Sequence, residues 1–378
     1  WRVPLSDIDF GAEELEAVQQ VVKSRWLTMG AVTQEFEREF AAYVGARHAI
    51  AVTNATAGLH MACVAAGLGP GDEAILPSLT FVATANAVRY TGAVPVFADI
   101  ESEDWLTLSP ASIEANLTDR TRAILVMHYA GFPCDMPAII EIAHRRNLVV
   151  LEDSAHAIGS TLDGRSLGTW GAIGCYSFFS NKNMTTGEGG MLTTDNDALA
   201  EKLRLLRSHR MTSLSWDRHQ GHAHSYDVVA LGYNYRIDEM RSALGRVQLR
   251  KLPSGNQRRG ELTALYRKLL AELTPEVLMP FSSPRGSSCH HILPVILPKD
   301  VDRNDIMESL KKSGIQTSIH YLPIHRFSHY SAEWQHRSNL LPVTEEVSTR
   351  QLTLPLFSTM KDVQVHWVVE GLRDALHG

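Results

Sequence analysis

The N-terminal part of the chain alternates between two hydrophobic patterns. Apolar residues recur at helical spacing in several segments, as in the helix expected from Met136 to Arg146. Between such segments lie short, continuous apolar runs that predict buried strands. Continuous strands that alternate with helices are typical of a mostly parallel sheet covered on both faces. The expected strands are His48–Thr53, Glu73–Leu76, Val94–Ile100, Thr121–His128, Leu148–Asp153, Cys175–Phe179 and Met191–Thr194.

Two further helices are predicted before the first strand. Residues 13–26 form an amphipathic pattern with Leu15, Val18 and Val22 on one face. The next helix is expected to follow Thr33, whose hydroxyl is suited to cap a helix N-terminus. The chain is therefore expected to enter the sheet from a helical segment.

The pattern changes after a long, charged segment, residues 238–273, which Pro253 and Gly255 interrupt. Two strand-like runs follow, near Ile292–Leu297 and Gln316–Ile319. This arrangement predicts a second, smaller α/β domain. We place the large domain at residues 1–250 and the small domain at residues 251–378.

The composition is that of an ordinary globular protein. Of 378 residues, 44% are hydrophobic and 21% are charged, and the net charge is −6. Because the chain has no basic stripe and no apolar run of membrane-spanning length, we expect no nucleic-acid partner and no membrane contact. The four cysteines form no CxxC pair and have no metal-ligand spacing. We therefore expect free thiols, no metal site and a cytoplasmic location.

On a parallel sheet, ligands bind at the carboxyl ends of the strands. After the first expected strand, Asn54, Ala55 and Thr56 open a helix whose backbone N–H groups are suited to bind a phosphate. Asn54 could equally be a simple helix cap. The fifth expected strand ends at Asp153, where a buried carboxylate needs a cationic partner or a function. His156 follows it, either as a donor to a ligand or as a core histidine with its hydrogen bonds satisfied.

The strand Cys175–Phe179 leads to Lys182 and then to a cluster of glycines. A lysine at the edge of a β-core can be desolvated and so made nucleophilic near neutral pH, although an ordinary surface lysine in a hairpin fits the same residues. Ser177 alternates with two aromatic residues and points to the opposite face. Phe81 lies where a strand leads into a helix and could stack on an aromatic ligand, or pack in the core.

Taken together, these residues match the requirements of pyridoxal 5'-phosphate. They supply a phosphate cradle, a stacking aromatic ring, an acid for the pyridinium, a hydroxyl and a lysine for a Schiff base. Their order is also that of aspartate-aminotransferase-like enzymes, in which the phosphate-binding helix comes first, then the aspartate, then the lysine.

These features occur together in a known family. The sequence resembles the DegT/StrS family of pyridoxal 5'-phosphate-dependent nucleotide-sugar aminotransferases along nearly its whole length. The EDxAHA, SFxxxKNxxxGEGG and GxNYR elements are specific to this family in combination. The segments that carry the resemblance are WLTMG, QEFEREFAAYVG, TNATAGLHMA, LPSLTFVATANAV, VLEDSAHAIGS, YSFFSNKNMTTGEGGMLTTD, LGYNYRIDEMRSALG and HYLPIHRFSHY.

The resemblance implies a fold and an assembly. It implies an α/β protein of the aspartate-aminotransferase-like fold (fold type I), with a mostly parallel sheet in the large domain. It also implies a homodimer whose two active sites are shared between the subunits. The segment 213–227, which holds His219, His222 and His224, would then be a mobile loop over the active site of the partner.

The resemblance assigns roles to the residues around the cofactor by motif position. Lys182 would form the Schiff base and move protons, and Asp153 would hold the pyridine nitrogen protonated. His156 would contact the phenolic oxygen of the ring, and Phe81 would stack on the ring.

Further residues are assigned to the phosphate and the substrate. Ser177 and the backbone of Ala55 and Thr56 would bind phosphate, together with Asn234 of the partner subunit. Relatives usually carry Ser-Gly-Thr where this chain has Asn54-Ala55-Thr56, so the sequence departs from the family pattern here, although Ala55 can still offer its N–H to a phosphate. Tyr321 is also expected near the substrate, although Tyr321 and Pro323 could equally shape a tight turn. The residues expected to line the substrate site are Trp26, Arg236, His320, Tyr321 and His325.

The expected reaction moves the amino group of L-glutamate onto a keto sugar nucleotide. A histidine after the EDxA element is more frequent in relatives that act at the sugar C4, which favours a dTDP-4-keto-6-deoxyhexose. The alternatives are a 3-keto sugar, an aminocyclitol ketone (an inosose) and a non-catalytic pyridoxal phosphate-binding regulator. Because Lys182 and Asp153 are both present, we favour an enzyme. A cysteine-based desulfurase is disfavoured because no cysteine lies in a loop next to Lys182.

Overall fold

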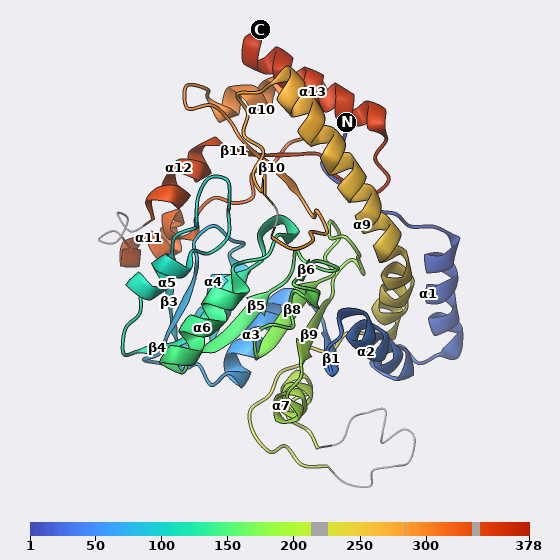
Figure 1. Cartoon of the computed structure of the whole chain (residues 1–378). Coiled ribbons are helices and arrows are strands. Elements are labelled where there is room, and N and C mark those ends of the chain that lie inside the picture. Colours follow the sequence, from blue (N-terminus) through green and yellow to red (C-terminus); the bar gives the residue numbers. More distant parts are fainter. Residues whose placement is uncertain (213–225, 284, 335–340) are drawn as a thin grey trace.

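The structure is a computed structural model that describes residues 1–212, 226–283, 285–334 and 341–378. Its centre is a seven-stranded sheet with the order β1-β9-β8-β5-β4-β2-β3 (Figure 1). Only β9 runs antiparallel to its neighbours, so the prediction of a mostly parallel sheet is confirmed. The strands are β1 (His48–Val52), β2 (Glu73–Pro77), β3 (Val94–Ala98), β4 (Thr121–Met127), β5 (Val149–Asp153), β8 (Ile173–Ser177) and β9 (Gly190–Thr194).

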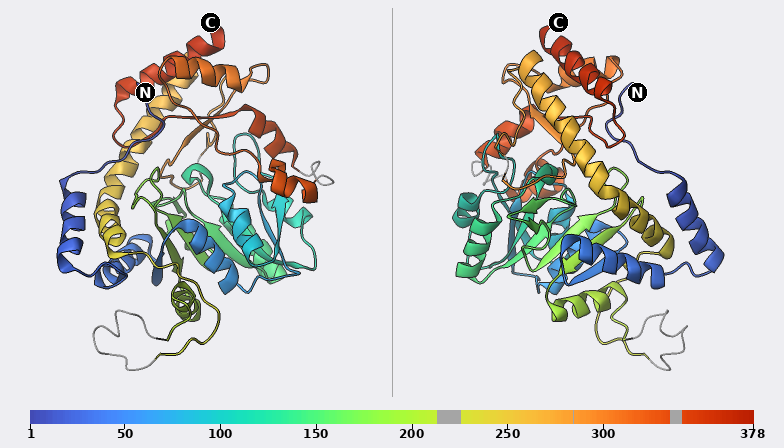
Figure 2. Two further views of the ribbon diagram at one scale, coloured as in Figure 1. Left: turned by 180° about the vertical axis from the view of Figure 1, so that it is seen from behind. Right: turned by 45° about the vertical axis from the view of Figure 1, so that its right-hand side comes forward.

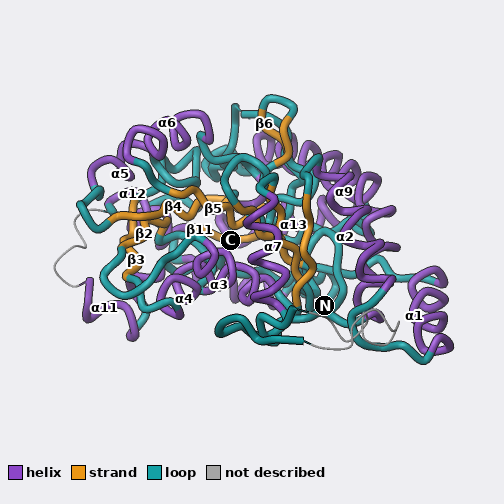
Figure 3. Tube along the Cα trace, turned by 90° about the horizontal axis from the view of Figure 1, so that it is seen from below, coloured by secondary structure: helices purple, strands orange, loops and turns teal. Residues whose placement is uncertain are grey.

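Helices cover both faces of this sheet. Figure 3, a view from below, shows α5 (Pro110–Ala115) and α6 (Met136–Arg146) on one side of the strands. On the other side lie α3 (Ala55–Ala65), α4 (Ala83–Tyr90) and α7 (Asp197–Arg207). Both faces are therefore buried, which is why the strands are apolar without alternation.

The longest helix is α9 (Glu239–Leu273), which begins beside the sheet and extends to the C-terminal part of the chain (Figures 1 and 2). The expected interruption at Pro253 and Gly255 is wrong, because both residues lie inside this single helix. Buried residues occur before and after Pro253, so tertiary packing outweighs the low helix propensity of proline. The predicted domain boundary at residue 250 falls within α9, and the division into two domains stays a prediction.

Beside α9 lie the two N-terminal helices, α1 (Ala12–Ser24) and α2 (Ala31–Val44). The helix predicted at residues 13–26 is confirmed as α1. Its apolar face is not buried within the chain, since Leu15 is 63% exposed and Val22 is 55% exposed. The buried residues of α1 are Glu14 and Val21, and the carboxylate of Glu14 lies 2.8 Å from the ammonium of Lys251 on α9.

Thr33 does not cap α2, which begins two residues earlier and has Gly30 at its N-cap position. Thr33 is buried within the helix instead, and its hydroxyl donates to the carboxylate of Glu239, 2.6 Å away. A carboxylate from another helix therefore does the capping that was expected of Thr33.

The C-terminal part forms a second core over the second half of α9. The predicted strand at 292–297 is confirmed as β10 (Leu293–Ile296), but its antiparallel partner is β11 (Gln351–Leu354). The strand expected at 316–319 is wrong, because these residues form only an isolated bridge between Ser318 and Thr353. The remaining elements are β6 (Thr161–Leu162), β7 (Arg165–Ser166), α10 (Arg303–Lys312), α11 (Ser328–Trp334), α12 (Pro342–Arg350), α13 (Asp362–His377) and two short 3-10 turns, Tyr129–Gly131 and Ile324–Arg326.

In the described parts of the chain, no helix is long and apolar enough to cross a membrane. The loop predicted at 213–227 lies largely outside the described residues, and so do His219, His222 and His224.

Candidate active site

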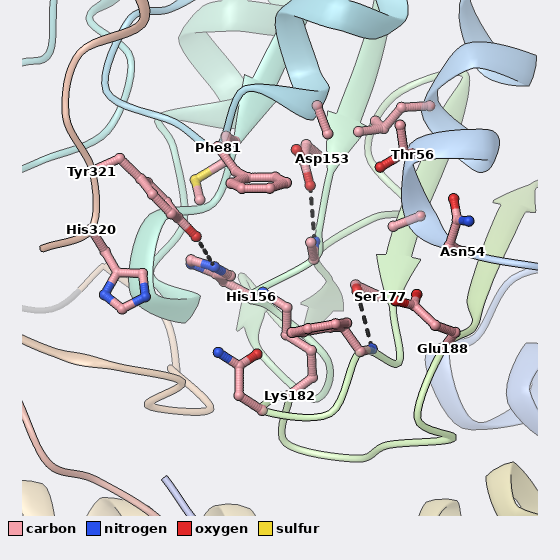
Figure 4. Close-up of a pocket in the computed structure, with 17 residues that line it drawn as sticks. Asn54, Thr56, Phe81, Asp153, His156, Ser177, Lys182, Glu188, His320 and Tyr321 are labelled. Carbon is pink, nitrogen blue, oxygen red and sulfur yellow. Dashed lines mark hydrogen bonds between the residues drawn. The ribbon is translucent and has the colours of Figure 1, made fainter. Parts of the chain in front are cut away.

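A cavity of about 570 Å³ lies at the carboxyl ends of β4, β5 and β8, where the start of α3 also meets the sheet (Figure 4). This is the edge at which the rule for parallel sheets places a ligand. The cavity collects side chains from segments far apart in the sequence. Its lining residues are Asn54, Ala55, Thr56, Leu59, Phe81, Ala83, Met127, Asp153, Ala155, His156, Ser177, Phe179, Asn181, Lys182, Glu188, His320 and Tyr321.

The first turn of α3 forms one wall of the cavity. The side chain of Asn54 accepts a hydrogen bond from the N–H of Ala57 at 2.8 Å, so Asn54 is the helix cap. Ala55 and Thr56 are the first two residues of α3, so no carbonyl of the same helix can accept a hydrogen bond from their N–H groups. Together with the positive end of the helix dipole they form an anion-binding wall.

Gly190 brings β9 against this wall. A Cβ atom at Gly190 would lie 2.8 Å from the backbone nitrogen of Ala55, a distance that real Cβ contacts do not reach. The hydroxyl of Ser177, on the neighbouring strand β8, accepts a bond from the N–H of Phe179 at 3.3 Å and keeps its proton for another acceptor. The glycine thus permits an oxyanion cradle between α3 and the end of the sheet.

Asp153 stands at the end of β5 and is 5% exposed. Its carboxylate accepts hydrogen bonds from the hydroxyl of Thr84 at 2.7 Å and from the N–H of Ala155 at 3.1 Å. Burial raises the pKa of Asp153, while these two bonds and the charge of Lys182 lower it. The carboxylate therefore faces the cavity as an acceptor for a buried cation.

Lys182 lies in the loop between β8 and β9, and its amine enters the same cavity. Burial lowers the pKa of Lys182 from its usual 10.5 to about 8, against the opposing charge of Asp153. A lysine with this pKa is partly neutral near pH 7, so it can act as a nucleophile and as a proton carrier. Of the two roles weighed for this lysine, its position excludes the ordinary surface lysine.

His156 and Tyr321 meet at one side of the cavity (Figure 4). The Nε2 atom of His156 lies 2.9 Å from the hydroxyl of Tyr321, and Nδ1 is 3.4 Å from the backbone nitrogen of Ala130. Burial lowers the pKa of His156 well below its ordinary value, so this ring is neutral. His156 is thus hydrogen-bonded within the protein and also lines the cavity.

The aromatic residues separate into core and cavity groups. Tyr176 and Phe178 pack in the core, while Ser177 between them faces the cavity, as the alternation along the strand predicts. Phe81 lines the cavity and is 52% exposed, so it is not a core residue. Its ring centroid lies 5.9 Å from that of Tyr321.

Four predicted site residues do not line this cavity in their own chain: Trp26, Asn234, Arg236 and His325. His325 is buried elsewhere, with Nδ1 bonded to the hydroxyl of Ser78 at 2.7 Å and Nε2 bonded to Glu345. This hydrogen-bonded chain holds the 320–325 segment to the end of β2. His320 and Tyr321, from the same segment, do reach the cavity.

Several functional candidates were missed by the sequence analysis. His291 places Nε2 3.4 Å from Nζ of Lys182, although it lies 109 residues further along the chain. Thr84 binds Asp153, and Asn181 and Glu188 line the cavity. No motif marks His291, which stands beside another histidine just before a strand. Thr84, Asn181 and Glu188 lie inside the quoted motifs and could have been found there.

Comparison with solved structures defines the class of protein. DesV of S. venezuelae, solved in complex with a ketimine intermediate, is 34% identical with a TM-score of 0.91, over 100% of this chain and 99% of that chain. Spr1654 of Streptococcus pneumoniae was solved in PLP and PMP forms that are 26% and 27% identical, each with a TM-score of 0.92 over 99% of this chain and 98% of that chain. The fold is that of the fold type I aminotransferases.

The family follows from the sequence. The model of the DegT/DnrJ/EryC1/StrS aminotransferase family matches residues 9–373. The spore coat polysaccharide biosynthesis protein SpsC of Bacillus subtilis (strain 168) is 39% identical over 373 residues, 97% of this chain and 95% of its own. The chain therefore belongs to the DegT/DnrJ/EryC1/StrS family and is a sugar aminotransferase. The PLP and PMP forms among its structural neighbours point to pyridoxal 5'-phosphate as its cofactor.

Proposed function

We propose that the protein transfers the amino group of L-glutamate to the keto group of a nucleotide-linked sugar, and that the sugar is a dTDP-4-keto-6-deoxyhexose. The observation that carries this proposal is the pairing of Lys182, with a pKa lowered to about 8, and the buried carboxylate of Asp153 in one cavity. Such a pair is what the protein contributes in enzymes that use pyridoxal phosphate. The family supports a sugar as the amino acceptor.

The residues in the cavity fit pyridoxal 5'-phosphate. The N–H groups at the start of α3 and the hydroxyl of Ser177 suit the phosphate, and Gly190 leaves room for a close backbone approach. Asp153 suits a protonated ring nitrogen, and the exposed ring of Phe81 suits stacking on an aromatic ligand. His156 suits the phenolic oxygen of the ring. Bound there, pyridoxal phosphate supplies an electron-accepting ring that stabilises negative charge at a substrate carbon.

The chain itself performs the proton transfers. In the first half of the reaction Nζ of Lys182 would carry the α-proton of L-glutamate to the cofactor carbon, and in the second half it would carry a proton from that carbon to the sugar carbon. The carboxylate of Asp153 would hold the proton on the ring nitrogen. His320 and Tyr321, at the side of the cavity opposite α3, would contact the sugar.

We further propose a homodimer in which each site takes residues from both chains. Asn234 is exposed and Arg236 is half-buried, and neither lines the cavity of its own chain. Next to them, Leu231 is 82% exposed and Val228 and Val229 are more than half exposed. An exposed apolar run of this kind is typical of an interface. Asn234 would reach the phosphate of the partner site, and Arg236 the diphosphate.

Trp26 would lie near the substrate in the same assembly. The neighbouring residues Ile8, Phe10, Leu15, Val22 and Leu27 are all at least 43% exposed, which gives the N-terminal segment an apolar surface of its own. A cytoplasmic location stays a prediction.

The test of the reaction uses the purified, cofactor-loaded protein. On addition of L-glutamate the visible band of the bound cofactor should bleach, and addition of the keto sugar nucleotide should restore it. A band that does not respond to any amino acid would contradict the transaminase proposal. The position of the new amino group, read by NMR of the product, separates a 4-keto sugar from a 3-keto sugar or an inosose.

A further inference from the structure

A chain of hydrogen bonds leads from the protein core to the amine of Lys182. The side-chain nitrogen of Asn256 donates to the carbonyl of Ile158 at 2.9 Å, and that of Asn183 donates to Asn256 at 2.8 Å. The same nitrogen of Asn183 donates to the carbonyl of Cys289 at 2.8 Å. Oδ1 of Asn183 lies 2.8 Å from Nδ1 of His291, whose Nε2 lies 3.4 Å from Nζ of Lys182.

The donor and the acceptor of each hydrogen bond in this chain follow from the two backbone carbonyls at which it begins. Backbone carbonyls can only accept, so the amide nitrogens of Asn256 and Asn183 must face Ile158 and Cys289. Oδ1 of Asn183 must then face His291. Because this oxygen also can only accept, Nδ1 of His291 carries a proton and donates it.

His291 is held in this orientation by its backbone as well. Its N–H donates to the carbonyl of Ala130 at 3.0 Å, and its own carbonyl accepts from Arg259 at 3.1 Å. The residue is 3% exposed. The ring packs against that of His156, with centroids 4.2 Å apart and the two planes at 51°.

The surroundings of His291 keep its ring neutral. The titratable groups that act on it are His156, Lys182, Arg259 and His320, each a base or a cation. Together with burial they lower the pKa of His291 well below its ordinary value. A neutral ring with its proton on Nδ1 has a bare lone pair on Nε2.

We propose that His291 is a positioning residue that holds the free amine of Lys182 through the lone pair on Nε2, with its tautomer fixed by Asn183. The inference rests on the proposed role of Lys182 as proton carrier and adds the group that orients it. With one N–H of Lys182 directed at His291, the rest of the amine points into the cavity. The bond also favours the ammonium form, because an acceptor binds a charged donor more strongly than a neutral one.

The first test reads the tautomer in the native chain. Full-length protein with 15N-labelled histidine is loaded with pyridoxamine phosphate, which leaves Lys182 free, and the two ring nitrogens of His291 are observed by NMR. The signal is assigned as the one lost in His291→Phe. The proposal expects a proton on Nδ1 and none on Nε2 between pH 6 and 9. A proton on Nε2 would overturn it.

The second test measures the titration of Lys182 directly. The cofactor-free chain is treated with pyridoxal across a range of pH, reduced with borohydride, and the modification of Lys182 is measured by mass spectrometry. In His291→Phe the midpoint should fall by about half a pH unit or more, because the ammonium loses its acceptor. An unchanged midpoint would refute the proposed bond. If that variant does not fold, His291→Gln, which keeps a polar side chain at the buried position, replaces it for both the assignment of the signal and the titration.

The matched control is His290→Phe, the same substitution at the adjacent residue. His290 packs against Phe132, with ring centroids 5.7 Å apart, and it is His291 that contacts Lys182. The midpoint of Lys182 modification in His290→Phe should therefore equal that of the wild type. An equal shift in both variants would overturn the proposal. Neither test uses an amino donor, so the outcome of each is independent of whether glutamate bleaches the visible band.

Discussion

At the scale of single residues, Lys182 is the group on which the proposed reaction depends. Lys182→Ala removes the amine but leaves Asp153, Ser177 and the start of α3 in place. We expect this variant to bind pyridoxal phosphate without a covalent bond and to lose amino transfer by about 10⁴-fold, since a positioned acid–base group contributes up to that factor. The measurements are cofactor content by absorbance and product by chromatography. Lys202→Ala, at a lysine that binds the carbonyl of Ala65 and does not line the cavity, is the control and should retain activity.

The lowered pKa of Lys182 also predicts a dependence of stability on pH. In the folded chain this pKa is about 8, against 10.5 for an ordinary lysine, so between these values the folded state binds fewer protons than the unfolded state. The free energy of unfolding therefore rises with pH across this window, and the full cost of the buried charge is present below it. We expect Lys182→Met to be more stable than the wild type by up to about 3 kcal/mol at pH 7.

Urea unfolding of the two cofactor-free chains at pH 7 and pH 10.5 checks this expectation. Most of the advantage of Lys182→Met should disappear at the higher pH, where the wild-type amine is neutral in the folded state and half neutral in the unfolded state. A difference that is the same at both values would show that the charge is not its cause.

The site residues at the strand ends could be predicted because a local sequence pattern, a polar residue after an apolar run, marks each of them. Asp153, Ser177 and Lys182 each follow an apolar run, and the structure brings all three to one cavity. His291 could not be predicted, because its role depends on a contact that the fold makes over a long distance. His325 was misplaced for the converse reason. It stands in the expected loop, but Ser78 and Glu345 satisfy both of its ring nitrogens away from the cavity.

At the scale of elements, the close approach of β9 to α3 shapes the anion-binding wall. A Cβ at Gly190 would lie 2.8 Å from backbone atoms of both Asn54 and Ala55, which cannot move aside as a side chain can. We expect Gly190→Ala to cost about 1–3 kcal/mol of stability and to weaken cofactor binding at least about tenfold. Titration of the cofactor-free chain measures the affinity. Gly69→Ala meets no atom within 4 Å and serves as the control.

The start of α2 depends on a carboxylate from α9. Glu239 is 2% exposed and accepts bonds from the N–H groups of Gly30, Val32 and Thr33 at 2.8–2.9 Å. Glu239→Gln removes the charge and replaces one acceptor with a donor, so we expect a loss of about 2–3 kcal/mol in urea unfolding. Glu35→Gln, on the exposed side of α2, should change stability by less than about 0.5 kcal/mol. Equal losses in both variants would refute the capping role.

The elements that the sequence predicted well are those buried on two faces. A continuous apolar run predicts a strand whose two faces are both buried, so no face has to be assigned. The strand β10 was predicted for the same reason. The pattern of α1 did not show which face is buried, because its buried contact is the ion pair of Glu14 with Lys251, while Leu15 and Val22 stay exposed. Hydrophobic periodicity predicts a helix, but the element against which the helix packs determines which of its faces is buried.

At the scale of the whole molecule, the proposed homodimer predicts that each site takes Asn234 from the partner subunit. Lys182, Asp153 and Ser177 line the cavity of their own chain, whereas Asn234 does not. Lys182→Ala and Asn234→Ala should each be impaired alone. In a mixed dimer, however, one of the two sites has both residues intact. Random reassociation of equal amounts of the two variants should therefore restore about a quarter of wild-type activity, since half of the dimers are mixed and each has one intact site.

The control for this experiment is a pair of variants whose residues come from the same chain. Lys182→Ala mixed with Asp153→Ala leaves every site defective, because the wild-type Lys182 always shares its cavity with the altered Asp153. This mixture should show no recovery, and gel filtration should show that both mixtures are dimeric. Recovery in the control, or none with Asn234→Ala, would mean that each chain builds its site alone.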